Sequence, residues 1–258
     1  MRAEHLALLG LVVVIAIAVL GPLTERVGAH RRRAFKPGII ALLLGAAAFV
    51  VSKLLLGAAA SRFGIEGSRE SKTDLVAVAF AFLVAGPIEE SLRVVATMPS
   101  LRSKGLHQPY DAMRVAVGSA LGFAALSTVD RLQGSPLTSL AVARGLMDIL
   151  AHTTLSALWG YALGRERRRR IVGVGFARGF LTAVVFGTIA THLLFARGAT
   201  AIFAVAPLVA TSSVFALVAR RDLIRMNDST RRSRLSRQSL HPYRRKRVYH
   251  PRWGRLFL

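Results

Sequence analysis

Long apolar runs separated by short polar stretches dominate the chain. Seven runs come close to or exceed the ~18–20 residues that cross a bilayer as a helix, and they lie at about 6–23, 38–60, 75–96, 112–130, 137–164, 171–195 and 199–219. Lipid cannot bond to backbone polar groups, so membrane-spanning chains form helices or closed barrels. Runs such as GIIALLLGAAAFVV lack the alternation of a barrel strand. The pattern therefore predicts an all-α, polytopic transmembrane bundle of about seven helices.

The basic residues between the runs predict an orientation. The odd-numbered connections and the tail hold 25 Lys or Arg, and the even-numbered connections hold five. Because basic loops stay on the cytoplasmic side, we expect the amino terminus outside and the carboxyl terminus in the cytoplasm. The first run, with only Arg2 and Glu4 before it and three arginines after it, is typical of a retained anchor rather than a cleaved signal peptide.

Composition supports a membrane protein and locates the charge. The chain is 53% hydrophobic, has no cysteine, and carries a formal net charge of +23, with thirteen Lys or Arg in residues 220–258. Basic blocks beside apolar runs are typical of topology determinants and of contacts with anionic lipid headgroups. We therefore expect a transmembrane domain over residues 1–225 and a disordered, lipid-contacting cytoplasmic tail over residues 226–258. A nucleic-acid partner is not expected, and cysteine chemistry is excluded.

The third run contains charges that are costly in lipid. In AFLVAGPIEESLRVVA (residues 81–96), Glu89 and Glu90 follow Pro87, which should kink the helix, and Arg93 comes one turn later. Arg93 can pair with either carboxylate, so a structural ion pair explains two of the three charges. It leaves the second carboxylate unexplained, and an intramembrane acid is a functional-site hypothesis. We therefore expect chemistry at the Glu pair.

The fifth run places three polar residues on one helix face. Arg144, Asp148 and His152 recur every four residues. Asp148 can bind Arg144 on one side and orient His152 on the other, as carboxylates do behind metal-binding or general-base histidines. The alternative is a core histidine that bonds to a neighbouring helix. Trp159 and Tyr161 are expected to be interfacial anchors.

Two further runs carry weaker signals. Gly118 and Gly122 form a small-xxx-small pattern that permits close helix approach. Ser127 and Asp130 follow near the end of the same run and could face a polar cavity. In the sixth run we expect the span to begin late enough that His192 reaches the middle of the membrane.

In order, these motifs resemble the PrsW family of intramembrane proteases, which is related to the CAAX-protease and bacteriocin-processing superfamily. The resemblance covers about residues 85–196. The first motif, Glu-Glu-x-x-Lys after a proline, resembles residues 87–93 with Arg93 in place of lysine. The other matches are Asp111 with the glycine motif of residues 118–128, then Arg144, His152 and Gly160-Tyr161, and finally His192.

The chain departs from the family pattern at two places. Ser127 and Thr128 stand where the family has Glu-Asn, and Ala196 stands where a carboxylate follows the last histidine. Serine and threonine are poor metal ligands beside a carboxylate. Asp130, one turn after Ser127, is a candidate substitute.

The resemblance implies a peptidase that hydrolyses membrane-anchored protein substrates, in a bacterial cytoplasmic membrane. Glu89 or Glu90 would be the general base, and the other Glu, with His152 and His192, would bind a divalent metal, zinc being the expected one. Arg144 and Asp148 would hold His152, and Arg93 would tune the Glu pair. A metal-free, glutamate-type mechanism remains open. The alternatives are an inactive scaffold that binds membrane proteins and an ion- or proton-coupled transporter.

Overall fold

The described part of the chain is entirely helical. The computed structural model describes residues 31–64, 75–102, 109–132, 138–169, 173–195 and 221. Within these ranges there is no strand, and the elements are α2 (Arg31–Arg62), α3 (Leu75–Phe80), the π-helix η2 (Ala81–Ala85), α4 (Gly86–Leu101), α5 (Pro109–Leu132), α6 (Ser139–Arg169) and α7 (Val174–Phe195). The all-α prediction is therefore confirmed. The first and last predicted spans and the basic tail lie outside the described residues.

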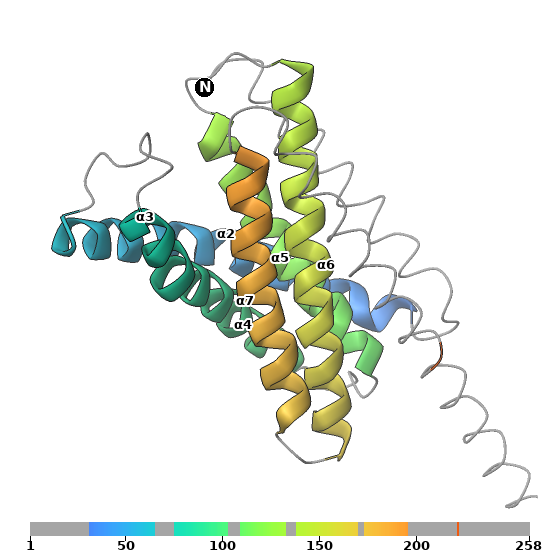
Figure 1. Ribbon diagram of the computed structural model, residues 1–258. Coiled ribbons are helices and arrows are strands. Elements are labelled where there is room, and N and C mark those ends of the chain that lie inside the picture. Colours follow the sequence, from blue (N-terminus) through green and yellow to red (C-terminus); the bar gives the residue numbers. More distant parts are fainter. Residues whose placement is uncertain are drawn as a thin grey trace, which may run out of the picture. The chain divides into compact units, whose positions relative to one another are not determined.

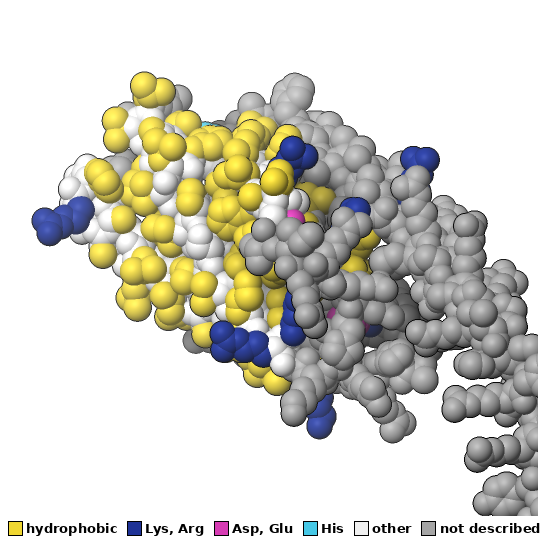
Figure 2. All heavy atoms as spheres, turned by 90° about the horizontal axis from the view of Figure 1, so that it is seen from below, with side chains coloured by type: hydrophobic (Ala, Val, Ile, Leu, Met, Phe, Trp, Pro, Cys, Tyr) yellow, Lys and Arg dark blue, Asp and Glu magenta, His cyan; other side chains and the backbone are white. Residues whose placement is uncertain are grey.

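Four described helical segments are long and apolar enough to cross a membrane: Lys36–Arg62, Leu75–Leu101, Pro109–Arg131 and Val174–Leu193. They coincide with four of the predicted runs. The α6 helix coincides with a fifth, but its polar residues make it less apolar. Figure 2 shows a broad face of hydrophobic side chains with Lys and Arg near its edge, as expected of a surface that meets lipid. The total of seven spans and the orientation remain predictions.

The α5 helix is the centre of the packing. The chain divides into two compact units, residues 1–212 and 213–258, and all of these helices belong to the first. In Figure 1, α5, α6 and α7 run alongside one another, and α2 crosses α5. A Cβ atom at Gly45 would overlap the backbone oxygen of Ser119, and one at Gly122 would overlap that of Leu42. A Cβ at Gly118 would also lie 2.8 Å from a backbone oxygen of α2. The prediction that Gly118 and Gly122 permit close helix approach is therefore confirmed.

The helix that carries the Glu pair is irregular one turn before it. Residues Ala81–Ala85 form a π-helix, and the N–H of Gly86 donates to the oxygen of Ala81, five residues back. Pro87 has no N–H, and its ring crowds the carbonyl four residues earlier, at Leu83. A wider turn relieves this crowding, and such π segments are frequent at functional sites. The expected irregularity is therefore present, but it precedes the proline.

The end of α6 ties down two other helices. Arg167 Nη1 donates to the backbone oxygen of Leu101 at the end of α4. The carboxylate of the preceding residue, Glu166, accepts the N–H groups of Gly173 at 3.0 Å and Phe176 at 2.9 Å, at the start of α7. Both contacts satisfy backbone groups that a helix end leaves unpaired. One end of α4 and one end of α7 are thus fixed to the same turn of α6.

Candidate functional site

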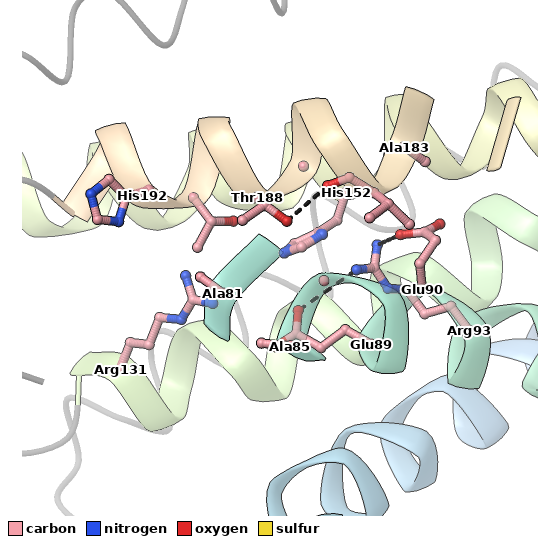
Figure 3. A pocket seen from close by; sticks show the side chains of 14 residues that line it. Ala81, Ala85, Glu89, Glu90, Arg93, Arg131, His152, Ala183, Thr188 and His192 are labelled. Atoms are coloured by element: carbon pink, nitrogen blue, oxygen red, sulfur yellow. Dashed lines mark hydrogen bonds and ion pairs between the residues drawn. The ribbon is translucent and has the colours of Figure 1, made fainter. Parts of the chain in front are cut away.

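A cavity of about 190 Å³ lies among η2, α4, α5, α6 and α7. Its polar lining comes from Glu89, Glu90 and Arg93 of α4, Arg131 of α5, His152 of α6, and Thr188, Thr191 and His192 of α7. Figure 3 shows His152 projecting toward α4, with the Glu90–Arg93 pair on one side. The structure therefore brings the Glu pair of the third predicted span and the histidine of the fifth to one pocket.

Glu90 is fully engaged by neighbouring side chains. Its Oε2 atom is 2.8 Å from Nη1 of Arg93. Its Oε1 atom accepts hydrogen bonds from Nε1 of Trp159 and, at 3.3 Å, from Oγ of Ser156. The Glu90 side chain is 2% exposed and that of Arg93 is 3% exposed. A buried carboxylate needs such partners because an unpaired charge is strongly destabilising, so Glu90 is held in a fixed position.

Glu89 has a different environment, although it is the adjacent residue. Its Oε2 atom is 3.8 Å from Nη2 of Arg93, beyond hydrogen-bond distance, and its side chain is 22% exposed. It lines the cavity on the side of the helix turned about 100° from Glu90. The two carboxylates therefore differ in kind: Glu90 holds Arg93, and Glu89 faces the open space.

His152 lies beside Asp148, which has a cation and a hydroxyl as partners. The distance from His152 Nε2 to Asp148 Oδ1 is 3.5 Å. Asp148 Oδ2 is 3.4 Å from Nη1 of Arg131, and Oδ1 accepts a hydrogen bond of 3.2 Å from Oγ1 of Thr191. His152 is 2% exposed, and neither of its ring nitrogens has a hydrogen-bond partner among the described residues. The alternative of a core histidine bonded to another helix is thus not what the described residues show.

A phenyl ring connects the two clusters. The guanidinium carbon of Arg93 lies 4.8 Å from the centre of the Phe123 ring. The His152 ring meets the same phenyl ring at 6.1 Å in an edge-on arrangement. Phe123 itself is fully buried. It therefore fixes Arg93 and His152 relative to each other through cation–π and aromatic contacts.

The predicted metal ligands are not gathered into a ligand set. The described residues contain no group of three or more His, Asp or Glu side chains that could hold a metal ion. His192 lines the cavity but is exposed, in the last turn of α7. Figure 3 shows it at the opposite end of the pocket from Glu90. By length and composition the candidate span covers Val174–Leu193, and the depth of His192 in the membrane stays a prediction.

The residues around the degenerate second motif lie outside the cavity lining. Asp130, the candidate substitute, forms an ion pair with Lys53 of α2. Ser127 and Thr128 are buried. Arg144 lies on α6 one turn before Asp148, and its predicted role in holding Asp148 stays a prediction, because the observed cation on Asp148 is Arg131.

The sequence did not identify two residues of the site. Arg131 counted only as a charge in a predicted loop, but it lines the pocket. Trp159 was predicted to be an interfacial anchor together with Tyr161, and this is wrong, because both are buried and Trp159 bonds to Glu90. A signal for Arg131 was available, since it directly follows the run that ends with Asp130. Nothing in the sequence pairs Trp159 with Glu90.

One of three comparisons with known proteins gives a match. The sequence profile described as "PrsW family intramembrane metalloprotease" matches residues 36–220. No curated protein and no solved structure matches the chain. The matched region is longer than the resemblance over residues 85–196 and includes most of α2 and every residue that lines the pocket. It covers well over half of the chain, which therefore belongs to the PrsW family of intramembrane metalloproteases.

Proposed function

We propose that this protein hydrolyses peptide bonds of membrane-anchored proteins at the pocket formed by α4, α5, α6 and α7, with Glu89 as the general base. One observation carries the proposal. The Glu89 carboxylate and the His152 ring, whose nitrogens have no hydrogen-bond partner among the described residues, line the same cavity. A base must lie within hydrogen-bond reach of a water in the site, and Glu89 is the pocket carboxylate that is not already held.

The reaction can be written with the residues of the pocket. Glu89 takes a proton from a water molecule, whose oxygen attacks the carbonyl carbon of the substrate. The guanidinium of Arg131, which lines the cavity, stabilises the negative charge that develops on the carbonyl oxygen. His152 orients the water through a free ring nitrogen. Glu89 then returns the proton to the amide nitrogen as the C–N bond breaks, so one water is consumed and a carboxylic acid and an amine are formed.

The family description implies a divalent metal, and the side chains can be tested against it. A catalytic zinc site takes three protein ligands. Arg93, Ser156 and Trp159 occupy the oxygens of Glu90, and no three-ligand group occurs among the described residues. The described side chains, as placed, do not form a three-ligand site for zinc or for another divalent metal. No step above is therefore routed through a metal.

The proposed substrate, lipid contacts and cellular location follow from the same assignment. The substrate is a membrane-anchored protein, because the pocket is built from helices long enough to cross a membrane. The arginine-rich stretch after residue 220 would contact anionic headgroups. The cytoplasmic membrane of a bacterium is the proposed location.

The test compares variants in vesicles that also contain a single-span reporter tagged at both ends. We expect Glu89→Gln to lower the cleavage rate by about 100-fold or more, the usual contribution of a general base. Thermal unfolding of this variant in detergent should match the wild type, because the Glu89 carboxylate lies 3.8 Å from its Arg93 partner.

The matched control is Asp130→Asn, which removes a carboxylate outside the cavity lining. It should cleave the reporter at the wild-type rate. Cleavage by Glu89→Gln at the wild-type rate would overturn the assignment of the base. Equal loss in both variants, together with lower unfolding midpoints, would show a general effect on folding and would also overturn it.

A further inference from the structure

We propose that Thr191 is a positioning residue that acts through Asp148 on His152, so that Nδ1 of His152 is the ring nitrogen that holds the attacking water. This inference rests on the proposed function, because it concerns the same pocket and the same reaction. It adds a residue of α7 to the site, and it says which of the two ring nitrogens is free to meet the water.

The first observation is the hydrogen bond made by the hydroxyl of Thr191. Threonine in a helix commonly donates to the carbonyl three or four residues earlier on the same helix. Thr97, Thr153 and Thr188 do so, at 2.8 or 2.9 Å. Oγ1 of Thr191 instead donates to Oδ1 of Asp148, on the neighbouring helix α6, at 3.2 Å. The Thr191 hydroxyl is therefore directed at a side chain of the site and not at its own backbone.

The second observation is that both oxygens of Asp148 are held from other helices. Asp148 is fully buried and is not among the described residues that line the cavity, whereas His152 and Thr191 are. Its Oδ2 atom is 3.4 Å from Nη1 of Arg131, on α5, and its Oδ1 atom bonds to Thr191, on α7. A carboxylate has a broad rotational preference about its last bond, so a single contact would leave its plane undetermined. Arg131 and Thr191 together therefore fix where Oδ1 lies.

The third observation is that the same oxygen faces the imidazole ring. Nε2 of His152 lies 3.5 Å from Oδ1 of Asp148. A negative oxygen at this distance favours the tautomer with the proton on Nε2, because the other tautomer directs a ring lone pair at the carboxylate. Nδ1 is then unprotonated and can accept a hydrogen bond from water. Thr191 thus fixes the oxygen, and the oxygen fixes which ring nitrogen is the acceptor.

The surroundings of the ring leave this acceptor to a molecule in the cavity. His152 is 2% exposed, and neither ring nitrogen has a hydrogen-bond partner among the described residues. Buried polar groups of this kind are normally satisfied by protein or by ordered water. The cavity has about 190 Å³, enough for more than one water molecule. Phe123 contacts the ring edge-on at 6.1 Å, which restricts its rotation.

The alternative role of the Thr191–Asp148 bond is a structural tie between α6 and α7. A tie would change only the stability of the protein when it is removed. A positioning bond would change kcat and the protonation of the two ring nitrogens in protein that remains folded. The experiment therefore measures cleavage, unfolding and the tautomer of His152 in the same variants.

The first measurement is reporter cleavage by variants of Thr191. Thr191→Val removes the hydroxyl with little change in shape, and we expect it to lower kcat about 10-fold, as loss of a group that orients a functional histidine does. KM should change little, since the bond does not touch the substrate. Thr191→Ser keeps the hydroxyl and should recover most of the loss. The matched control is Thr153→Val, because the Thr153 hydroxyl bonds to its own helix and does not line the cavity; it should cleave as the wild type does.

Wild-type cleavage by Thr191→Val would overturn the proposal. An equal loss in Thr191→Ser, or in Thr153→Val, would also overturn it, because the effect would then not come from the Thr191 hydroxyl.

The second measurement does not depend on cleavage or on the folding of a Thr191 variant. The chain has seven histidines, so in protein labelled with ¹⁵N-histidine the His152 signals are those absent from His152→Ala. Solid-state NMR of the wild type in vesicles should show a protonated Nε2 and an unprotonated Nδ1, and Thr191→Val should show a mixture of both tautomers. A protonated Nδ1 in the neutral ring of the wild type, or an unchanged tautomer in folded Thr191→Val, would overturn the proposal. Neither result would affect the assignment of the base, which fails only if Glu89→Gln cleaves normally.

Discussion

The indole N–H of Trp159 donates a hydrogen bond to Oε1 of Glu90, although the two residues are 69 positions apart in the sequence. The bond joins α6 to the second turn of α4. On its other oxygen Glu90 holds Arg93, so Trp159 fixes the carboxylate that in turn fixes the guanidinium. Glu89, the preceding residue of α4, is left to face the cavity.

Replacing Trp159 by Phe should destabilise the protein and reduce activity. Phenylalanine keeps the aromatic contact with Phe176, whose ring lies 6.3 Å away, but it removes the donor to Glu90. Leaving a buried acceptor without this partner costs about 1–3 kcal/mol. We expect a lower midpoint in thermal unfolding in detergent, together with slower reporter cleavage.

A double-mutant cycle with Glu90→Gln separates the hydrogen bond from packing. If Trp159 acts through Glu90, the loss of unfolding free energy caused by Trp159→Phe should differ between the wild-type and Glu90→Gln backgrounds by about 0.5 kcal/mol or more. Strict additivity of the two substitutions would contradict this account.

Removing the Arg93 cation from the Glu pair should destabilise the protein more than Trp159→Phe does. Arg93→Met leaves Glu90, which is 2% exposed, without its charge partner, and breaking a buried pair in this way costs about 3–5 kcal/mol. The control is Arg93→Lys, which restores the residue type of the family motif and keeps the charge. We expect unfolding in detergent at a much lower temperature for Arg93→Met and a smaller change for Arg93→Lys; equal midpoints would argue against the ion pair.

The sequence was informative where local spacing decides the contact. The pairing of Arg93 with Glu90 and the closeness of Asp148 to His152 both follow from spacings of three or four residues on one helix. The apolar runs likewise located each described helix, because bilayer thickness sets the length of such runs.

The sequence could not predict contacts that depend on how helices cross. Trp159 near the end of an apolar run is typical of an interfacial residue, yet α5 and α7 cover it on α6. Whether Glu89 or Glu90 faced the cavity depended on which helix packed against each, and periodicity alone gives only the angle between them. His192 shares the pocket without joining a ligand set for the same reason.

The contact of α2 with α5 should depend on single glycines. Gly45→Ala places a methyl group on the backbone oxygen of Ser119, whereas a Cβ atom at Gly57, on the same helix, meets nothing within 4 Å. Overpacking of this kind costs about 1–3 kcal/mol. In detergent, Gly45→Ala should unfold at a lower temperature than the wild type, and Gly57→Ala should not. Similar midpoints for the two variants would mean that α2 does not approach α5 this closely.

The ion pair between Lys53 and Asp130 should contribute to helix packing and not to chemistry. Lys53 is 45% exposed, and exposed pairs contribute about 1 kcal/mol or less. Asp130→Asn should therefore retain reporter cleavage with a small change in stability, and the exchange Lys53→Asp/Asp130→Lys should recover most of that stability. Loss of cleavage in Asp130→Asn with an unchanged unfolding midpoint would instead place Asp130 in the reaction, as a substitute for the carboxylate missing from the second motif.

Arg131 provides the sharpest test of the reaction, because it lines the cavity and contacts Asp148 Oδ2 at 3.4 Å. Its guanidinium can stabilise the developing oxyanion, and loss of one such donor lowers kcat by roughly 100- to 1,000-fold. We expect Arg131→Gln to lower kcat for the reporter with little change in KM, since the interaction strengthens only in the transition state. Arg131→Lys should recover part of the loss. Arg178→Gln removes an exposed arginine of α7 that does not line the cavity, so it should behave as the wild type. A raised KM with unchanged kcat in Arg131→Gln would assign Arg131 to substrate binding and remove it from the chemical step.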